Sequence, residues 1–409
     1  MKHTIALGAA LLLALLPTLN AADHPALREQ VLALGKLTTP PATHDAEGFP
    51  SEGGMKALFF DALPWKGKPT RVFAWLGMPA KHDGKVPGMV LVHGGGGTAH
   101  KLWVKKWTDR GFAAISIAVE GQADQPGGPG ANGRRSWKSH PWAGPARNGI
   151  YGDSSAPLAD QWMYHAVADC ILANSLLRSL PDVDTAKIGL MGFSWGGVIT
   201  STVVGIDPRF AFAVPVYGCG HLAHAENQYG RNLGKNDLYQ KVWDPVLRAD
   251  RVKIPVLWLS WPEDQHFPMY CLAVTYRSMP APRMVSLIPK MGHGGGPSWT
   301  RPESYAFAES IVETGGAWCM SAQASAANGT ATAQFKATRP LQKAELVSTT
   351  GTGFTGSRVW AESPAALVEK DGTWLATSPL PAGTTAWFIN VHSGGLVASS
   401  DYQEGTETP

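Results

Sequence analysis

Short apolar runs alternate along the chain with amphipathic helical stretches, and this alternation limits the possible folds more than any other feature. The runs are too continuous for strands with one solvated face, and they fit strands of a parallel sheet covered on both faces. They lie at Gly88–Val92, Ala113–Val119, Ile188–Gly192, Ala213–Tyr217, Ile254–Trp261 and Val285–Ile288. The helical stretches lie at Lys101–Arg110, Ala159–Leu180, Val198–Val204, Met269–Met279 and Glu303–Thr314. We therefore predict an α/β fold with a doubly wound, mostly parallel sheet.

The two ends of the chain have a different pattern from the middle. A short helix is expected at Ala26–Leu34, followed by an antiparallel pair at Ala57–Phe60 and Arg71–Leu76. Residues 323–409 are rich in Thr, Val and turn residues, which predicts a small C-terminal antiparallel β-sandwich module beside a main domain at 23–322. Its expected strands are Ala331–Ala337, Glu345–Ser348, Arg358–Ala361, Trp374–Thr377, Thr385–Val391 and Gly395–Ser399.

Composition bears on the class of protein, and the first residues bear on its destination. Apolar residues make up 44% of the chain and charged residues 16%, which suits a large buried core. The net charge is +3 and no block of Lys and Arg occurs, so we expect no nucleic-acid partner. Residues 1–22 combine Lys2, an apolar run and small residues at Ala21 and Ala22, the pattern of a secretory signal peptide. We predict export to the periplasm or medium without stable membrane anchoring, and the sequence leaves the oligomeric state open.

The four cysteines suggest one disulfide in an oxidising compartment. Cys219 and Cys271 both follow predicted strands on the same side of the sheet, so we expect this pair to be bonded. The alternative is that these two, with Cys170 and Cys319, are four buried thiols. No Cys-x-x-Cys pair or Cys/His cluster predicts a zinc site.

The pentapeptide Gly192-Phe-Ser-Trp-Gly196 is the strongest chemical signal in the chain. It joins an apolar strand to a helix of small residues, the setting of a G-x-S-x-G turn that exposes a serine hydroxyl at the sheet edge. A serine hydroxyl needs a base to become nucleophilic. We predict Ser194 as a nucleophile.

The partners of such a serine follow it in the order acid, then histidine. The strand ending at Trp261 leads into Glu263 and Asp264, and we expect the shorter Asp264 to be the acid. The last strand leads into His293 on a glycine-flanked loop, where its imidazole can reach the serine. The competing histidine is His266, only two residues from Asp264.

A run of glycines, His93-Gly-Gly-Gly-Gly97, follows the first parallel strand. Its backbone N–H groups, at Gly95 and Gly96, are expected to form an oxyanion hole with the N–H of Trp195. A phosphate cradle is the rival interpretation, but no Gly-Lys-Ser/Thr follows the run. His93 is expected to brace the loop, and the scattered histidines lack metal-ligand spacing, so we predict no metal and no cofactor.

Residues 121–157 interrupt the strand–helix alternation with many Gly and Pro residues. A long loop of this kind is often functional, and we predict a lid or wall over the site. Its aromatic residues Trp137, Trp142 and Tyr151 are the expected substrate-binding residues. Trp195 and the segment His221–Val242 are expected to contribute to the same pocket.

Several of these stretches resemble exported bacterial acetyl xylan esterase-like proteins, close to dienelactone hydrolases and to the catalytic domain of prolyl oligopeptidases. The resemblance covers Arg71 to Thr314. It is carried by Asp160–Asp169, Leu190–Gly197, Gly205–Phe210 and Val216–Gly220. It implies the α/β-hydrolase fold, a Ser194–Asp264–His293 triad and hydrolysis of a small-molecule or polysaccharide ester.

Two other functions stay open at this point. One is a peptidase of the prolyl-oligopeptidase type, although the long N-terminal propeller of that family is missing. The other is a binding protein whose C-terminal module holds polysaccharide. The tryptophans of that module, Trp360, Trp374 and Trp387, are expected to pack in its core rather than to stack on sugars.

Overall fold

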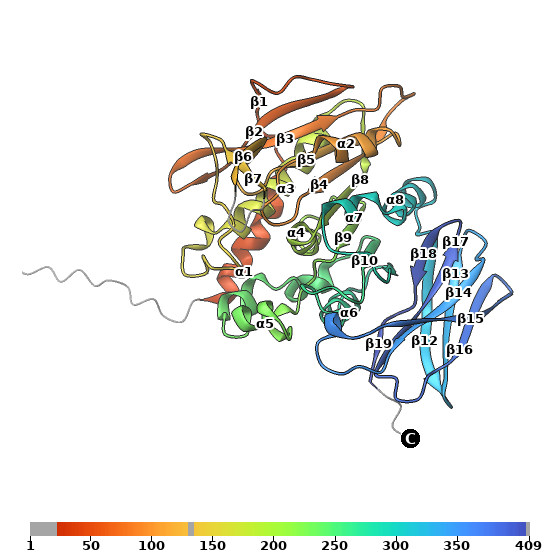
Figure 1. Cartoon of the computed structure of the whole chain (residues 1–409). Helices are drawn as coiled ribbons and strands as arrows, with labels where there is room; N and C mark the ends of the chain where they lie inside the picture. The colour runs from red at the N-terminus through yellow and green to blue at the C-terminus, as the bar shows by residue number, and fades with distance from the viewer. Residues whose placement is uncertain (1–22, 130–134, 406–409) are drawn as a thin grey trace, which may run out of the picture.

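Parallel strands form the centre of a long mixed sheet in the computed structural model, which describes residues 23–129 and 135–405 (Figure 1). They lie side by side in the order β5, β4, β8, β9, β10, β11. Their bounds are β4 Val86–Val92, β5 Ala113–Ile117, β8 Val183–Phe193, β9 Phe212–Val216, β10 Val256–Ser260 and β11 Arg283–Leu287. Each apolar run overlaps one of these strands, which confirms the predicted α/β sheet. The predicted signal peptide lies outside the described residues.

Antiparallel strands extend the sheet beyond β5. They are β3 (Lys68–Gly77), which pairs with β5, then β2 (Met55–Trp65) and β1 (Thr43–Asp45). The predicted antiparallel pair is confirmed, because Phe59 lies opposite Phe73 in the register of β2 and β3.

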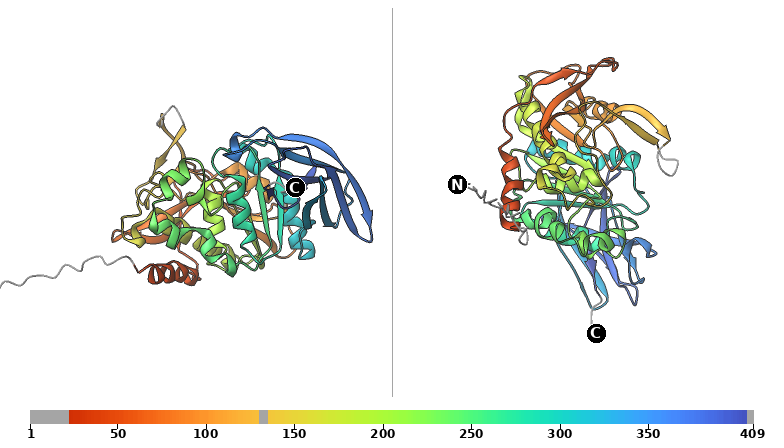
Figure 2. Two further views of the ribbon diagram at one scale, coloured as in Figure 1. Left: turned by 90° about the horizontal axis from the view of Figure 1, so that it is seen from below. Right: turned by 90° about the vertical axis from the view of Figure 1, so that its left-hand side faces the viewer.

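Helices cover both faces of the sheet (Figures 1 and 2). On one face, α2 (Lys101–Thr108) packs against α8 (Pro302–Thr314), with the rings of Trp107 and Tyr305 4.7 Å apart. On the other face, α3 (Trp162–Ser179) and α4 (Trp195–Val203) contact each other and β8. The remaining helices are α1 His24–Ala33, α5 Gln228–Leu233, α6 Met269–Arg277 and α7 Gly295–Thr300. None of the helices in 23–129 or 135–405 has the length and hydropathy of a membrane span.

The segment 121–157 is more ordered than the sequence suggested. Strands β6 (Gln122–Pro129) and β7 (Arg135–Ser139) form an antiparallel hairpin that projects from the body of the molecule (Figure 2). Residues 130–134 between them lie outside the described part of the chain. After β7 the chain returns to the body through turns, and the backbone N–H of Arg71 donates to the carbonyl of Trp142 over 2.9 Å.

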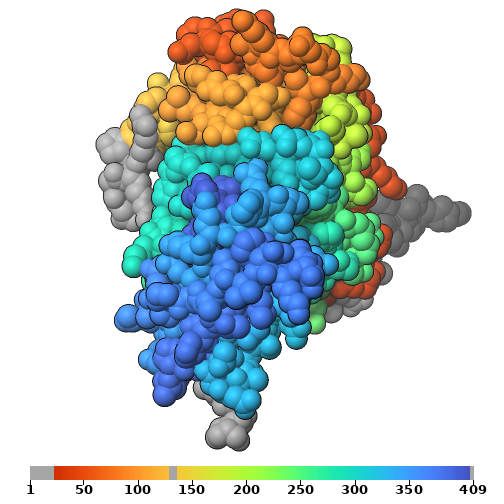
Figure 3. Space-filling view, turned by 90° about the vertical axis from the view of Figure 1, so that its right-hand side faces the viewer, coloured from red at the N-terminus to blue at the C-terminus, as the bar shows by residue number. Residues whose placement is uncertain are grey.

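The C-terminal strands form two sheets that share β15. The first has the order β12, β13, β16, β15, and the second continues from β15 through β14 and β17 to β18. Strand β18 also pairs with β11, so the module continues the main sheet and packs tightly on it (Figure 3). The bounds are β12 Cys319–Ala327, β13 Thr330–Ala337, β14 Lys343–Thr349, β15 Ala361–Lys370, β16 Thr373–Pro379, β17 Ala386–Ser393, β18 Leu396–Ser399 and β19 Gln403–Glu404.

Two details of that module differ from the sequence prediction. The strand expected at Arg358–Ala361 was wrong, because only Ala361 of this stretch belongs to a strand. The second difference is that the prediction did not include β12 or the main part of β15. The side chains of β15 alternate between exposed and partly buried positions, and β12 is rich in Ala and Ser, so neither strand has the apolar pattern that reveals a core strand. Trp360 and Trp387 are buried, 8% and 3% exposed, in agreement with a packing role.

Candidate active site

Ser194 stands on the sharp turn between β8 and α4. Its backbone has φ 56° and ψ −120°, a strained conformation for a residue with a side chain. The turn is possible because glycines flank it: a Cβ on Gly192 would collide with the carbonyl oxygen of Gly196, and one on Gly196 with that of Val92. The geometry holds the hydroxyl out at the carboxyl edge of the sheet.

The structure brings Ser194, His293 and Asp264 into one hydrogen-bonded chain. Nε2 of His293 lies 3.0 Å from Oγ of Ser194, and its Nδ1 lies 2.8 Å from Oδ2 of Asp264. This arrangement allows the imidazole to take the serine proton while the carboxylate fixes its tautomer. The imidazole bonded to Ser194 is that of His293, and His266 lies against it with ring centroids 4.7 Å apart.

Asp264 is held by more donors than the histidine alone. Its Oδ2 also accepts a hydrogen bond from Nε1 of Trp261 at 3.0 Å. Its Oδ1 accepts from the backbone N–H groups of His266 and Phe267, at 2.7 and 3.0 Å. The side chain is 1% exposed. The neighbouring Glu263 instead accepts from the N–H of Lys290 at the surface, so Asp264 is the carboxylate of the site.

Tyr217, which sequence reasoning did not single out, supports the histidine loop. Its ring stacks on His293 with centroids 4.4 Å apart, and its hydroxyl donates to the carbonyl of Gly292 over 2.8 Å. Burial raises the pKa of Tyr217, which keeps this donor protonated at neutral pH. Its position directly after an apolar strand was an available signal.

The glycine loop after β4 lies beside Ser194, but its predicted oxyanion donors need a correction. The N–H of Gly96 donates to Oε1 of Glu120 over 3.0 Å, so it is not free to face a substrate. The backbone N–H groups of Gly95 and Trp195 make no hydrogen bond within the described residues and remain as candidate donors. Trp195 is also the first residue of α4, where the helix dipole favours negative charge.

His93 braces this loop, as the sequence suggested. Its Nδ1 donates to the carbonyl of Gly94 over 2.6 Å, and its Nε2 accepts from the N–H of Val119 at 3.0 Å. Both nitrogens are therefore used by one neutral tautomer. Burial lowers the pKa of His93, which fits that neutral form.

Ser194 opens into a pocket of about 410 Å³. Besides the triad and glycine residues, the pocket is lined by Arg147, Phe193, Trp195, Tyr229 and His266. Arg147 comes from the predicted loop 121–157 and Tyr229 from the predicted segment His221–Val242. Within the described residues, no group of three or more His, Cys, Asp or Glu side chains is arranged to hold a metal ion.

The three aromatic residues predicted to bind substrate do not line this pocket. Trp142 lines a separate hollow of about 500 Å³, where the guanidinium of Arg71 lies over its ring. Tyr151 is buried beneath the site, with its ring 5.7 Å from that of Trp195. Trp137 lies on the β6–β7 hairpin, near His100. The structure does not bring these three side chains to Ser194, because Trp137 lies on the projecting hairpin and the chain after β7 turns Trp142 and Tyr151 toward other parts of the molecule.

The predicted disulfide between Cys219 and Cys271 is also wrong. All four cysteines in the described part of the chain are free, buried thiols. Sγ of Cys271 instead donates to the carbonyl of His221 over 3.4 Å. Burial raises the pKa of Cys271 to about 12 and also that of Cys219, so both stay protonated.

Comparisons with known proteins bear on the family and the fold. The family model for acetyl xylan esterase (AXE1) matches residues 58–226, a stretch that includes Ser194 and ends before Asp264. The structure resembles an acetyl xylan esterase from Paenibacillus sp. R4 at 22% identity and a TM-score of 0.51, covering 68% of this chain and 90% of that one. It also resembles acetyl xylan esterase 1 from Thermoanaerobacterium sp. JW/SL YS485 at 19% identity and a TM-score of 0.51, covering 67% and 89%. No protein of curated function matches the chain.

The chain has the α/β-hydrolase fold. The order of the strands, the serine turn and the similarity to the two acetyl xylan esterase structures support this fold assignment. The chain has in addition a C-terminal β-module that follows α8, and the connection between β14 and β15 lies against the loop that carries Asp264.

Contacts between this connection and the Asp264 loop are direct. The side chain of Gln265 donates to the carbonyl of Gly356, and the N–H of Met269 donates to Oγ1 of Thr355 over 3.1 Å. A Cβ on Gly356 would collide with the carbonyl oxygen of Asp264. The module therefore packs directly against the loop that carries Asp264.

We expect the substitution Gly356→Ala to lower kcat on p-nitrophenyl acetate by about ten- to a hundredfold, with a smaller effect on KM. The added methyl group forces the Asp264 loop to move, and small displacements of catalytic groups have effects of this size. Steady-state kinetics test it. Gly316→Ala is the matched control, because a Cβ there meets no atom within 4 Å. Equal kcat values for the two variants would show that the module does not position the acid.

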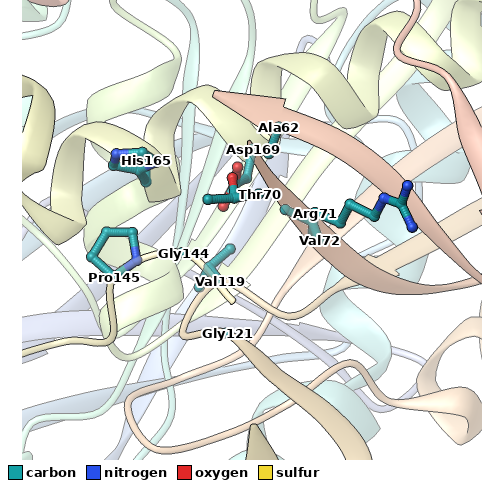
Figure 4. A pocket seen from close by; sticks show the side chains of 10 residues that line it. All are labelled: Ala62, Thr70, Arg71, Val72, Val119, Gly121, Gly144, Pro145, His165 and Asp169. Carbon is teal, nitrogen blue, oxygen red and sulfur yellow. The ribbon is translucent and has the colours of Figure 1, made fainter. Parts of the chain in front are cut away.

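A second, much smaller hollow lies behind β3, between that strand and α3 (Figure 4). Its volume is about 10 Å³, enough for one water molecule and too small for a substrate. Asp169 faces it with Oδ1 unpaired, and the guanidinium of Arg71 points away from it. Thr70 donates to the carbonyl of Leu63 rather than to this carboxylate. Burial raises the pKa of Asp169 well above its ordinary range.

We expect Asp169→Asn to stabilise the protein at neutral pH, raising Tm by about 2 to 5 °C. The unfolded carboxyl ionises near pH 4, whereas the folded one keeps its proton to a higher pH, so wild-type stability falls as pH rises through that interval. The gain should therefore shrink as pH approaches 4. Calorimetry at several pH values measures it, with the exposed Asp182→Asn as control. A lower Tm for Asp169→Asn at pH 7 would mean that the buried carboxylate is ionised and paired.

Proposed function

We propose that the protein is an exported serine carboxylesterase that acts through an acyl-enzyme on Ser194. The observation that carries the proposal is the chain of hydrogen bonds from Asp264 through His293 to Ser194, which ends in an open pocket. The match to the acetyl xylan esterase model supports an ester, of a small acyl group or a carbohydrate, as substrate.

The first half of the proposed reaction forms the acyl-enzyme. Oγ of Ser194 attacks the carbonyl carbon of the ester while its proton passes to Nε2 of His293. Negative charge develops on the carbonyl oxygen, where the N–H groups of Gly95 and Trp195 donate hydrogen bonds, each typically worth about 3 kcal/mol. The bond to the alcohol oxygen then breaks, and that oxygen takes the proton from His293.

The second half releases the acid. Water attacks the acyl carbon and gives its proton to His293. The bond between the acyl carbon and Oγ of Ser194 breaks, and Oγ regains the proton. The carboxylate of Asp264 stays ionised throughout and stabilises the positively charged imidazole that forms in each half.

A serine peptidase of the prolyl-oligopeptidase type would use the same three side chains. Hydrolysis of p-nitrophenyl acetate and butyrate, compared with that of N-acylated peptide anilides, separates the two functions. We expect kcat/KM to be higher for the esters than for the anilides. The ratio of the two kcat/KM values should also exceed the ratio of the spontaneous hydrolysis rates of the same compounds. A ratio below the spontaneous one would overturn the esterase proposal in favour of the peptidase.

Export is part of the proposal because of the signal-peptide pattern in residues 1–22. Expression of the full chain in a Gram-negative host, followed by cell fractionation and N-terminal sequencing, tests it. We expect the protein outside the cytoplasm with a new N-terminus near residue 23. Full-length protein confined to the cytoplasm would contradict export.

A further inference from the structure

Arg147 supplies the permanent charge of the pocket above Ser194. Among the described residues that line this pocket, the others are glycines, aromatic residues, Ser194 and two histidines. The nearby carboxylates face away from the opening: Asp264 is 1% exposed and Glu120 6% exposed. A ligand in the pocket therefore meets a cationic group without an exposed carboxylate beside it.

The guanidinium of Arg147 is held firmly on one side. Its Nε lies 3.2 Å from Oε1 of Glu120, and its Nη1 donates to the carbonyl of Gly149 over 2.6 Å. Its plane lies over the ring of Trp195, with Cζ 5.1 Å from the ring centroid. These contacts fix the guanidinium before any ligand binds, so little side-chain entropy remains to be lost.

The remaining amino group, Nη2, makes no hydrogen bond to any described residue. It lies beside the glycine loop, 2.8 Å from the position that a Cβ on Gly95 would occupy. Gly95 is also packed against the ring of Trp195, the residue that follows the serine. Nη2 therefore lies beside Gly95 in the pocket that Ser194 also lines.

A guanidinium in this setting is best matched by a carboxylate, since charge-assisted hydrogen bonds are about twice as strong as neutral ones. Glu120 offsets part of the charge of Arg147, but it contacts Nε and leaves the N–H groups of Nη2 available to a ligand. Neutral esters would leave Nη2 solvated and gain nothing from it.

We propose that Arg147 is a specificity-determining residue that binds a carboxylate of the substrate, so that the preferred substrates are esters of molecules that also carry a carboxylate. This inference rests on the proposed esterase function. The carboxylate can belong to the acyl group or to the alcohol, and the test below distinguishes these two sources.

The experiment compares two pairs of esters that differ in charge. For the acyl side, mono-p-nitrophenyl glutarate is compared with p-nitrophenyl valerate. For the alcohol side, p-acetoxybenzoate is compared with its methyl ester. In at least one pair we expect kcat/KM of the anionic ester to be about tenfold higher or more, the effect of one charge-assisted hydrogen bond. The difference should reside mainly in KM and shrink as NaCl is raised, because salt screens the charge pair.

Two variants of Arg147 then assign the preference to this side chain. We expect Arg147→Gln to bring the ratio within the preferred pair close to one, mainly through the KM of the anionic ester. Arg147→Lys keeps the charge and should restore part of the ratio. Tm is measured for both variants. A folding defect would lower Tm and would also lower kcat/KM for both members of each ester pair.

The outcomes separate this inference from the esterase proposal. If wild type hydrolyses the neutral esters but shows no preference for either anionic ester, the inference is wrong and the esterase stands. If Arg147→Gln lowers kcat equally for charged and neutral esters, Arg147 acts on the reaction centre itself and the inference is again wrong. If wild type hydrolyses no ester faster than Ser194→Ala does, both proposals fall together.

Discussion

Replacing Ser194 with alanine is expected to lower kcat on p-nitrophenyl acetate by about 10⁴-fold or more. The variant keeps the pocket, the imidazole and the backbone donors, but it loses the oxygen that attacks the ester. Removal of the nucleophile from a serine triad has effects of this size, with a residual rate from the oxyanion hole and binding. Steady-state and single-turnover kinetics on purified protein measure the loss.

Ser201→Ala is the matched control for that experiment. Ser201 lies on the same helix, α4, is buried, and donates to the carbonyl of Gly197 over 2.8 Å. It stands away from the pocket, so we expect kcat within about threefold of wild type and a modest loss of Tm of the kind that follows from one lost hydrogen bond. A Ser194→Ala variant as active as Ser201→Ala would mean that the hydrolysis occurs elsewhere.

Asp264→Asn is expected to have the second largest effect, a loss in kcat of about 10⁴-fold. All four contacts of the carboxylate come from donors, two at each oxygen. An amide has one accepting atom, so in either orientation its NH₂ group faces two N–H donors. If it faces His293, the imidazole must accept at Nδ1, which places its proton on Nε2 and prevents it from taking the serine proton.

The neighbouring Glu263→Gln serves as the control for this substitution, because it removes a carboxylate from the same loop without touching His293. We expect its kcat to stay within about threefold of wild type, as for other surface substitutions. The comparison is made over pH with Tm measured in parallel. Similar losses for both variants would point to general disruption of the loop, and the assigned role of Asp264 would be wrong.

Sequence reasoning located the features that depend on local pattern and chain order. The parallel strands are apolar runs, and the turn around Ser194 is a contiguous motif with a strand before it and a helix after it. His293 and Asp264 follow the ends of consecutive strands, so their approach to Ser194 follows from the topology of a parallel sheet. These parts of the structure required no knowledge of side-chain packing.

The errors concern positions that depend on contacts between distant side chains. The N–H of Gly96 is occupied because Glu120, on another loop, reaches it. Arg147 is held at the pocket by the side chain of the same Glu120. The sequence around Arg147 has no periodic pattern that would predict this position. Trp142 and Tyr151 face other spaces because the chain after β7 turns back on itself. Such partners are not encoded in neighbouring residues. For this reason the residues that line the pocket were predicted less well than Ser194, His293 and Asp264.

The C-terminal module illustrates a related point. Its strands were predicted as a separate sandwich, yet β18 pairs with β11 and Gly356 touches the loop of Asp264. Contacts of this kind between distant parts of the chain leave no pattern in the sequence. The Gly356→Ala experiment tests whether they matter for activity.

The central claim, a hydroxyl of Ser194 activated by His293, is tested most directly by covalent labelling. The protein is incubated with a fluorophosphonate, and the labelled residue is located by peptide mass spectrometry. We expect one label per chain, on Ser194, absent in Ser194→Ala and formed at least about a hundredfold more slowly in His293→Ala. A label on another residue of catalytically active enzyme, or unchanged labelling of Ser194 without His293, would contradict it.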